Sequence, residues 1–269
     1  MPCRMPPAGP RGAAGFRRLG PTRLPRIMTY NVHRCLGLDG QLSPRRIVSV
    51  IAACKPDIVA LQELDVGRLR TGQIDQARLI AHELGMAFHF QPAIHVLEEK
   101  FGDAILTAGD CRLMRAGLLS VRGWLPDIRS RGALWVKVTL GGRDIHVINT
   151  HLGLLPAERT GQVSALLGPD WLGHPDCRDP VLLAGDFNAV PQGKSCRRLA
   201  RRLGAKWQGL GRGPLPTFPS NFPVAKLDHV FASGVRFTAM EVVHTPLARV
   251  ASDHLPLIAD FEFGAVHPH

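Results

Sequence analysis

The sequence contains no apolar run of about 18 residues, the length that a helix needs to cross a bilayer, so we expect no transmembrane helix. Its first 26 residues carry positive charge but lack the apolar stretch of roughly 7–15 residues found in secretory signals. A cytoplasmic location is therefore predicted. The six cysteines include no CxxC pair, which argues against a zinc site, and we expect them to remain free thiols.

Several catalytic motifs are also missing from the sequence. Without a GxSxG turn, a serine nucleophile of the hydrolase type is not expected. Without GxxxxGK[ST] or GxGxxG loops, nucleoside triphosphate and dinucleotide cofactors are not expected, and no HExxH pattern favours zinc. The chemistry of this chain must therefore rest on dispersed polar residues.

Positive charge is the main compositional excess, with a net charge of +11 over 269 residues. Six arginines lie in the first 26 residues, where there is no acidic residue; the remainder holds 27 basic against 22 acidic residues, a net charge of +5. A polyanionic substrate fits this excess. The charge does not distinguish nucleic acid from phospholipid or a small phosphate ester.

The pattern of residues predicts one large domain at 26–263 between a disordered Pro-, Gly- and Arg-rich tail at 1–25 and a short tail at 264–269. Ser43-Pro44 is typical of a helix start, and Gly85 of a helix end. The predicted helices span 44–54, 75–84, 156–167 and 194–203.

Apolar runs and turn residues predict the strands. They span 26–33, 57–62, 86–96, 103–107, 112–122, 133–140, 143–149, 180–184, 227–232, 236–244 and 255–263, and 204–225 is expected to be a long loop. Each half of the chain has only enough helices to cover one face of a sheet. We therefore predict a four-layer α/β/β/α sandwich of two mixed sheets with helices on the outer faces.

Polar residues of one kind recur at the ends of these strands. They are Asn31, Glu63, His151, Asp186, Asn188, Asp228, Asp253 and His254. One polar residue at a strand end usually only meets solvent, but sites are commonly built from loops at strand ends, and here the whole set is Asp, Asn, Glu and His. Carboxylate and amide oxygens suit Mg²⁺ or Mn²⁺. The set therefore predicts metal-assisted attack of water on phosphorus.

Six segments together resemble the endonuclease/exonuclease/phosphatase superfamily over residues 26–263. They are TYNVH (29–33), LQE (61–63), THL (150–152), GDFN (185–188), LDHVF (227–231) and SDHLPL (252–257). The resemblance implies a four-layer α/β/β/α sandwich, in agreement with the pattern of elements, and a divalent-metal-dependent phosphoesterase.

The resemblance also implies metal ligands. Glu63 would be the principal ligand of Mg²⁺ or Mn²⁺, with Asn31 beside it and Asp253 on the metal or its water shell. Arg131, in the segment RGAL, resembles a phosphate contact of some members, and a solvated strand charge is an equal alternative.

The remaining residues would carry the reaction. Asp186 would orient the attacking water and take its proton, while Asn188 would hold that water or a phosphoryl oxygen. His254 would contact the phosphate, Asp228 would fix its tautomer and raise its pKa, and His151 would be a second phosphate contact. The alternatives are a simple turn at Asp186 and Asn188, and a structural pair of Asp228 and His254.

Some positions depart from the pattern of abasic-site endonucleases. His33 stands where those enzymes have Asp, and the single tyrosine, Tyr30, does not fill their mid-site tyrosine position. Asp103, in FGDAIL, stands where many members have Asn. Abasic-site repair is therefore not the predicted activity.

Three hypotheses about function remain. The first is a phosphodiesterase that acts on nucleic acid; the second is a sphingomyelinase-like lipid phosphodiesterase or small-molecule phosphatase, although no exposed apolar hairpin is evident; the third is an inactive binding protein. No obligate protein partner is evident. A basic cluster that spans the helix predicted at 194–203 and the residues just after it could bind nucleic acid or anionic lipid, but a solvated helix face is the favoured interpretation. Its members are Arg197, Arg198, Arg201, Arg202 and Lys206.

Overall fold

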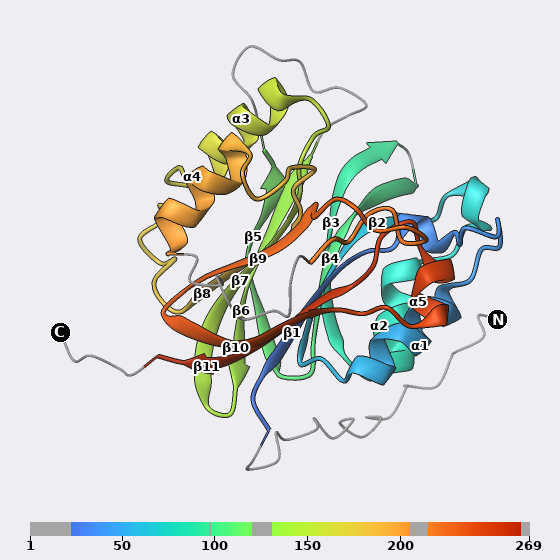
Figure 1. Ribbon diagram of the computed structural model, residues 1–269, viewed down its shortest axis with the longest axis horizontal. Coiled ribbons are helices and arrows are strands. Elements are labelled where there is room, and N and C mark those ends of the chain that lie inside the picture. Colours follow the sequence, from blue (N-terminus) through green and yellow to red (C-terminus); the bar gives the residue numbers. More distant parts are fainter. Residues whose placement is uncertain (1–22, 97, 120–130, 205–214, 265–269) are drawn as a thin grey trace, which may run out of the picture.

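The computed structural model describes residues 23–96, 98–119, 131–204 and 215–264. Two sheets pack face to face between two outer layers of helices (Figure 1). The predicted four-layer sandwich of two mixed sheets is thereby confirmed. None of the helices in these described ranges combines the length and the apolar character needed to cross a bilayer.

The six-stranded sheet has the order β10-β11-β1-β2-β4-β3. β1 and β2 run parallel, and the other neighbours are antiparallel. The strands are β1 (Arg26–Asn31), β2 (Ile58–Val66), β3 (Ala87–Val96), β4 (Glu99–Thr107), β10 (Val235–Val242) and β11 (Leu257–Phe263).

The five-stranded sheet has the order β5-β6-β7-β8-β9. β7 and β8 run parallel, and the other neighbours are antiparallel. The strands are β5 (Asp110–Leu118), β6 (Gly132–Leu140), β7 (Arg143–His151), β8 (Val181–Asp186) and β9 (Asp228–Ser233).

The helices form the two outer layers of Figure 1. One layer holds α1 (Pro44–Cys54), α2 (Gln76–Leu84) and α5 (Pro246–Ala251), and the other holds α3 (Pro156–Leu166) and α4 (Lys194–Leu203). Two short 3-10 turns, η1 (His33–Cys35) and η2 (Leu69–Thr71), follow β1 and β2. Local chemistry sets the helix ends: the side chain of Asp75 accepts a hydrogen bond from the Arg78 N–H at the start of α2, and Gly85 ends that helix with φ 63°.

Apolar side chains form two cores, one on each side of the five-stranded sheet. Ile27, Leu61 and Leu134 are fully buried in the core that joins the inner faces of both sheets and extends under α1 and α2. Trp135 and Phe231 lie in the second core, under α3 and α4. Because side chains alternate between the faces of a strand, neighbouring Leu134 and Trp135 serve different cores.

The elements differ from prediction in a few places. α5 lies where a loop was expected between two strands. It was not predicted because its six residues are too few to show helical periodicity. β2 continues to Val66 rather than ending at residue 62, and β4 begins at Glu99 rather than 103. The additional residues mix charged residues with Leu64, Val66 and Phe101, so they do not continue the unbroken apolar run.

Most of the predicted tails, part of the strand at 112–122 and part of the loop at 204–225, with Lys206 of the basic cluster, lie outside the described residues. Within the predicted N-terminal tail, Arg23 forms an ion pair with Asp57 and donates a hydrogen bond to the carbonyl of Lys55. The cysteines that the structure describes are free thiols, as predicted; they are Cys35, Cys54, Cys111, Cys177 and Cys196.

Candidate active site

The five-stranded sheet brings three of the predicted residues into one row. The last residues of the parallel strands β7 and β8, His151 and Asp186, are register partners. Asp186 is also the partner of Asp228, the first residue of the antiparallel strand β9. The carboxyl ends of β7 and β8 and the amino end of β9 therefore meet at one end of the sandwich, where β9 begins in Figure 1.

Gly185 lets β7 and β8 approach closely at this end. A Cβ atom on Gly185 would lie 1.9 Å from the carbonyl oxygen of Thr150, and the φ of Gly185 is 150°. Any side chain would force the two strands apart. The glycine of the GDFN segment is therefore required for the contact between His151 and Asp186.

The turn after β8 fixes Asn188. Asn188 has φ 47°, and its backbone N–H donates to Oδ1 of Asp186 at 2.9 Å. Its side-chain Nδ2 donates to the carbonyl of Leu152 at 2.9 Å and lies 3.1 Å from Nε2 of His151. Asparagine tolerates this left-handed conformation because its short side chain makes such local hydrogen bonds.

The six-stranded sheet contributes Asn31 and Glu63. Asn31 ends β1, and Glu63 lies in β2 where the register with β4 shifts between Leu61 and Leu64. Glu63 has φ 61°, so this bulge holds a non-glycine residue in a left-handed conformation and re-aims its carboxylate. Nδ2 of Asn31 lies 3.3 Å from Oε1 of Glu63 and 3.0 Å from Oδ2 of Asp186. Asn31 thus joins the two sheets at the site.

Two buried side-chain amides, those of Gln62 and Asn149, stabilise the backbone next to the Glu63 bulge. Nε2 of Gln62 donates to Oδ1 of Asn149 at 2.8 Å, across the gap between the two sheets. Nδ2 of Asn149 donates to the carbonyls of Leu61 and Ala104, at 2.8 and 2.9 Å. Both amides are fully buried, and their hydrogen bonds satisfy backbone groups next to the register shift.

His254 forms the other wall of the site. Its Nδ1 lies 2.8 Å from Oδ2 of Asp228, and its Nε2 lies 3.6 Å from Oδ2 of Asp186. Burial lowers the pKa of His254, but attraction by Asp228, the hydrogen bond to it and the charge of Asp186 outweigh burial and raise the pKa. The ring is therefore an imidazolium at neutral pH.

The charge state of Asp186 is governed mainly by burial. Burial and repulsion by Asp228 raise the pKa of Asp186 to about 7, although His254 and the hydrogen bonds from Asn188 and Asn31 lower it. A carboxylate with a raised pKa can accept a proton near neutral pH.

His151 and Arg131 are also brought to the site. Burial and the positive charges of Arg131 and His254 lower the pKa of His151 well below its usual value. His151 is therefore neutral, and its Nε2 lies 3.5 Å from Oδ2 of Asp186 and accepts from Asn188. Among the described residues, Nδ1 of His151 and Nε of Arg131 are buried without a hydrogen-bond partner.

Asp103 was not predicted as a site residue, yet the structure places it here. Its side chain is 3% exposed, and burial raises its pKa to about 7, against the charge of Arg131 and a hydrogen bond from the Glu63 backbone. The Asp in FGDAIL, where many family members have Asn, was the one feature of the sequence that could have pointed to Asp103. Its place in the site depends on the pairing of β4 with the bulged part of β2, which the sequence does not show.

Thr217 and Phe218 lie in the stretch predicted to be a long loop, and both contact the residues around His254. The carbonyl of Thr217 accepts from the Leu255 N–H at 2.7 Å, and its hydroxyl accepts from the Asp228 N–H at 3.3 Å. The Phe218 ring packs on the ring of His254, with the centroids 4.8 Å apart. No apolar or charged pattern in this segment predicted these contacts.

Asp253 lies at the rim. Its carboxylate is 31% exposed and 4.0 Å from Nδ1 of His33. Ser252 ties this loop to β1 by donating its hydroxyl to the carbonyl of Asn31 at 2.7 Å. Tyr30, the neighbour of Asn31 in β1, is fully buried in the apolar core.

The donor set fits a hard divalent cation. Glu63 offers carboxylate oxygens, and the side-chain amide of Asn31 lies beside it, with Nδ2 3.3 Å from Oε1 of Glu63 and Oδ1 accepting from the His33 N–H. Carboxylate and amide oxygens suit Mg²⁺ or Mn²⁺. A second group, Asp186, Asp228 and His254, has ligand atoms within 4.8 Å of one another. A histidine ligates only as neutral imidazole, whereas Asp228 raises the pKa of His254. The geometry therefore offers two candidate metal positions, one at Glu63 and one at this second group.

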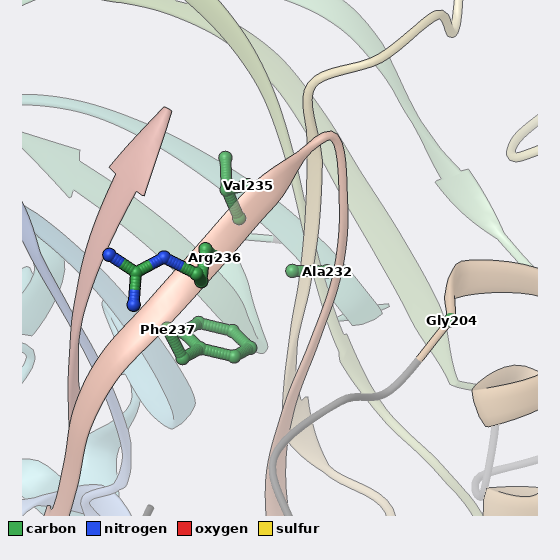
Figure 2. Close-up of a pocket in the computed structure, with 5 residues that line it drawn as sticks. All are labelled: Gly204, Ala232, Val235, Arg236 and Phe237. Carbon is green, nitrogen blue, oxygen red and sulfur yellow. The ribbon is translucent and has the colours of Figure 1, made fainter. Parts of the chain in front are cut away.

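A small cavity lies far along the sheet from this site. Its volume is about 180 Å³, and it is lined by Gly204, Ala232, Val235, Arg236 and Phe237 (Figure 2). The charged group in that lining, Arg236, is paired with Glu262. Ala232 lies near the opposite end of β9 from Asp228, so the cavity is separate from the candidate active site.

Comparison with known proteins agrees with this geometry. A model described as the Endonuclease/Exonuclease/phosphatase family matches residues 28–254. The chain is 27% identical over 248 residues to the uncharacterized protein YbhP of Escherichia coli (strain K12), covering 87% of this chain and 95% of that protein.

Solved structures show the same fold. An endonuclease/exonuclease/phosphatase from Beutenbergia cavernae DSM 12333 matches with a TM-score of 0.73 at 24% identity, covering 90% of this chain and 72% of that one. The mannosyl-6-phosphatase Bt3783 of Bacteroides thetaiotaomicron VPI-5482 matches with a TM-score of 0.71 at 19% identity, covering 89% and 100%. The human Nocturnin catalytic domain with bound sulfate matches with a TM-score of 0.67 at 21% identity, covering 89% and 94%.

Proposed function

Because this chain belongs to the endonuclease/exonuclease/phosphatase family, we propose that it is a divalent-metal-dependent phosphodiesterase that cleaves nucleic acid by attack of water on phosphorus. The observation that carries the proposal is the shared position of Asp186. Its Oδ2 lies 3.0 Å from Nδ2 of Asn31 and 3.6 Å from Nε2 of His254, between the metal side and the imidazolium side of the site.

The residues divide the reaction between them. Asp186 takes the proton of the attacking water, since its raised pKa makes it a base near neutral pH. Asn188, fixed by its left-handed turn, orients that water or a phosphoryl oxygen. His254, kept positive by Asp228, binds a phosphoryl oxygen through Nε2 and stabilises the charge that develops in the transition state.

Two predicted roles are refined by the local contacts. His151 is a neutral acceptor for Nδ2 of Asn188, which supports a positioning role beside the predicted phosphate contact. Arg131 lies close enough to shift the pKa of both His151 and Asp103, which supports its predicted role in binding substrate.

Glu63 and Asn31 would hold the Mg²⁺ or Mn²⁺ ion, with Asp253 at its water shell. The ion would neutralise negative charge on the phosphoryl oxygens. The strained φ of Glu63 supports this role, because backbone strain is retained where a side chain must be aimed.

The balance of charge favours a diester over a monoester. Five carboxyl groups lie in or at the rim of the site, against the positive charges of His254, Arg131 and Lys226, which interacts with Asp228; they are Glu63, Asp103, Asp186, Asp228 and Asp253. A monoester phosphate carries roughly −1.5 to −2 charge near pH 7, whereas a diester carries about −1. The less charged diester is repelled less by such a site.

Hydrolysis of two small esters tests the proposal. Bis-p-nitrophenyl phosphate should be hydrolysed with Mg²⁺ or Mn²⁺ and faster than p-nitrophenyl phosphate, and EDTA should stop the reaction. Asp186→Asn should lower kcat by at least roughly 10²-fold. The control Asp176→Asn, at an exposed position, should not change it. Turnover that survives EDTA would rule out the metal role.

One observation favours a lipid substrate as a second candidate. The sequence showed no exposed apolar hairpin, but Phe218 and Ala225 form a bridge, and between them Phe222 and Val224 are 73% and 68% exposed. This turn includes Phe218, which packs on the ring of His254. Hydrolysis of sphingomyelin vesicles, lost in Phe222→Ser/Val224→Ser while bis-p-nitrophenyl phosphate is still cleaved, would select the lipid over nucleic acid.

A further inference from the structure

Helix α4 carries an unusual density of positive charge. Its ten residues, KSCRRLARRL, contain five cations and no acid. Two of the arginines point back onto the protein. Nη1 of Arg198 lies 3.0 Å from Oγ of Ser164 on α3, and Nη2 of Arg202 donates to the carbonyl of Leu172 at 3.0 Å. These two side chains attach α4 to the layer of helices.

The other three cations form a stripe on the outer face. Lys194, Arg197 and Arg201 are exposed and follow one another at intervals of three and four residues, which places them on one side of a helix. With Ala200 they line an open groove of about 470 Å³. In the described parts of the chain, none of the three has an ion-pair partner.

This arrangement is unfavourable for the isolated protein. Like charges at such spacings repel each other, and Lys194 lies in the first turn of the helix, where the backbone dipole is already positive. An ordinary solvated helix face would mix in acidic residues to offset both effects. The stripe is instead suited to a partner that brings negative charge.

The stripe begins next to the candidate active site. The carbonyl of Ala189, directly after Asn188, accepts a hydrogen bond from Nε2 of His229 at 2.8 Å and one from Sγ of Cys196 in the first turn of α4 at 3.5 Å. The amino end of α4 is thus packed on the turn that carries Asn188. From there helix α4 runs along the outer layer of the sandwich (Figure 1).

We propose that the face of α4 formed by Lys194, Arg197 and Arg201 binds the phosphate backbone of a nucleic-acid strand outside the active site. This inference rests on the proposed phosphodiesterase activity and deepens it. The stripe spans about 10 Å at 1.5 Å per residue, and one strand of a duplex presents a phosphate about every 3.4 Å of its axis. The stripe therefore covers about three such intervals, which allows each of its three cations to meet a separate phosphate.

Two charge-matched double variants test the proposal. Arg197→Gln/Arg201→Gln removes two cations from the stripe, and Arg45→Gln/Arg78→Gln removes two exposed cations from α1 and α2, in the opposite helix layer. Binding of a fluorescent single-stranded oligonucleotide is measured by anisotropy in EDTA over a series of KCl concentrations. Thermal unfolding of each variant confirms that it is folded.

The stripe variant should bind roughly tenfold more weakly at low salt, and its plot of log affinity against log salt should flatten by about 0.7 for each phosphate that the variant no longer binds. The α1–α2 variant should bind like the wild type. Equal effects of both variants, or no effect of either, would overturn the proposal. So would weakened binding to phosphatidylserine vesicles with unchanged binding to the oligonucleotide.

A small substrate separates this inference from the proposed function. Bis-p-nitrophenyl phosphate is too short to reach α4, so the stripe variant should hydrolyse it at the wild-type rate. Absence of metal-dependent hydrolysis by the wild type would refute the proposed function. Normal hydrolysis together with unchanged oligonucleotide binding by the stripe variant would refute only the role of α4.

Discussion

Nδ1 of His254 lies 2.8 Å from Oδ2 of Asp228, and this contact determines the charge of the ring that faces Asp186. Burial alone would make His254 neutral, but Asp228 keeps it positive. Asp228 itself is fully buried, and its Oδ1 has no hydrogen-bond partner in the described part of the chain. Its carboxylate therefore acts on the site through the contact with His254 and through repulsion of Asp186.

Removing the charge of Asp228 should disable His254 without unfolding the protein. In Asp228→Asn the pKa of His254 should fall, because the attraction that outweighs burial is removed, and kcat for bis-p-nitrophenyl phosphate should fall by roughly 10²–10⁴-fold. NMR titration of the His254 ring measures the first effect directly. An unchanged titration would show that Asp228 does not control the ring.

The metal position is expected to depend on Glu63. Mg²⁺ at about 100 times its dissociation constant should raise the free energy of unfolding by about 2.7 kcal/mol, and Glu63→Gln should abolish most of this gain. His254→Gln should retain it, since the protonated ring is not a ligand. Calorimetric titration with Mg²⁺ gives the same comparison. The reverse result would place the metal at the group of Asp186, Asp228 and His254.

Gly185 is expected to tolerate no side chain. Gly185→Ala places a Cβ 1.9 Å from the carbonyl oxygen of Thr150, so β7 and β8 must separate, and the free energy of unfolding should fall by more than about 3 kcal/mol. Gly40→Ala is the control, because Gly40 also has positive φ but has no neighbour within 4 Å. That variant should lose only about 1 kcal/mol. Similar losses measured by urea unfolding would refute the steric argument.

His229 should make the protein sensitive to acid. Burial lowers the pKa of His229 to about 4, so below pH 6.5 the unfolded chain binds a proton that the folded chain does not. The contribution of the neutral ring to stability is full above pH 6.5 and is lost as the pH falls toward 4, a change of about 3 kcal/mol. Urea unfolding of the wild type and His229→Gln should diverge by that amount between pH 7 and 4. A constant difference would contradict the burial argument.

Much of the site could be predicted because its residues follow recognisable strands. GDFN and SDHLPL identified Asp186, Asn188 and His254 as members of one site, and the structure brings them together. Asp103 could not be predicted as a member, because it lies in the middle of β4 and reaches the site only through the register shift in β2. The contacts of Thr217 and Phe218 around His254 could not be predicted either, because the loop before β9 has no pattern that indicates them.

The sequence by itself determined the two-sheet architecture, the identity of the polar residues at the strand ends and the hard-ligand chemistry, because alternation and strand-end position are local properties of the chain. The tertiary structure decided what these residues do to each other. Asn31 and Asp186 are 155 residues apart, and only the packing of the two sheets brings the amide within 3.0 Å of the carboxylate. Charge states depend in the same way on burial and on neighbours from the other sheet, which no local pattern encodes.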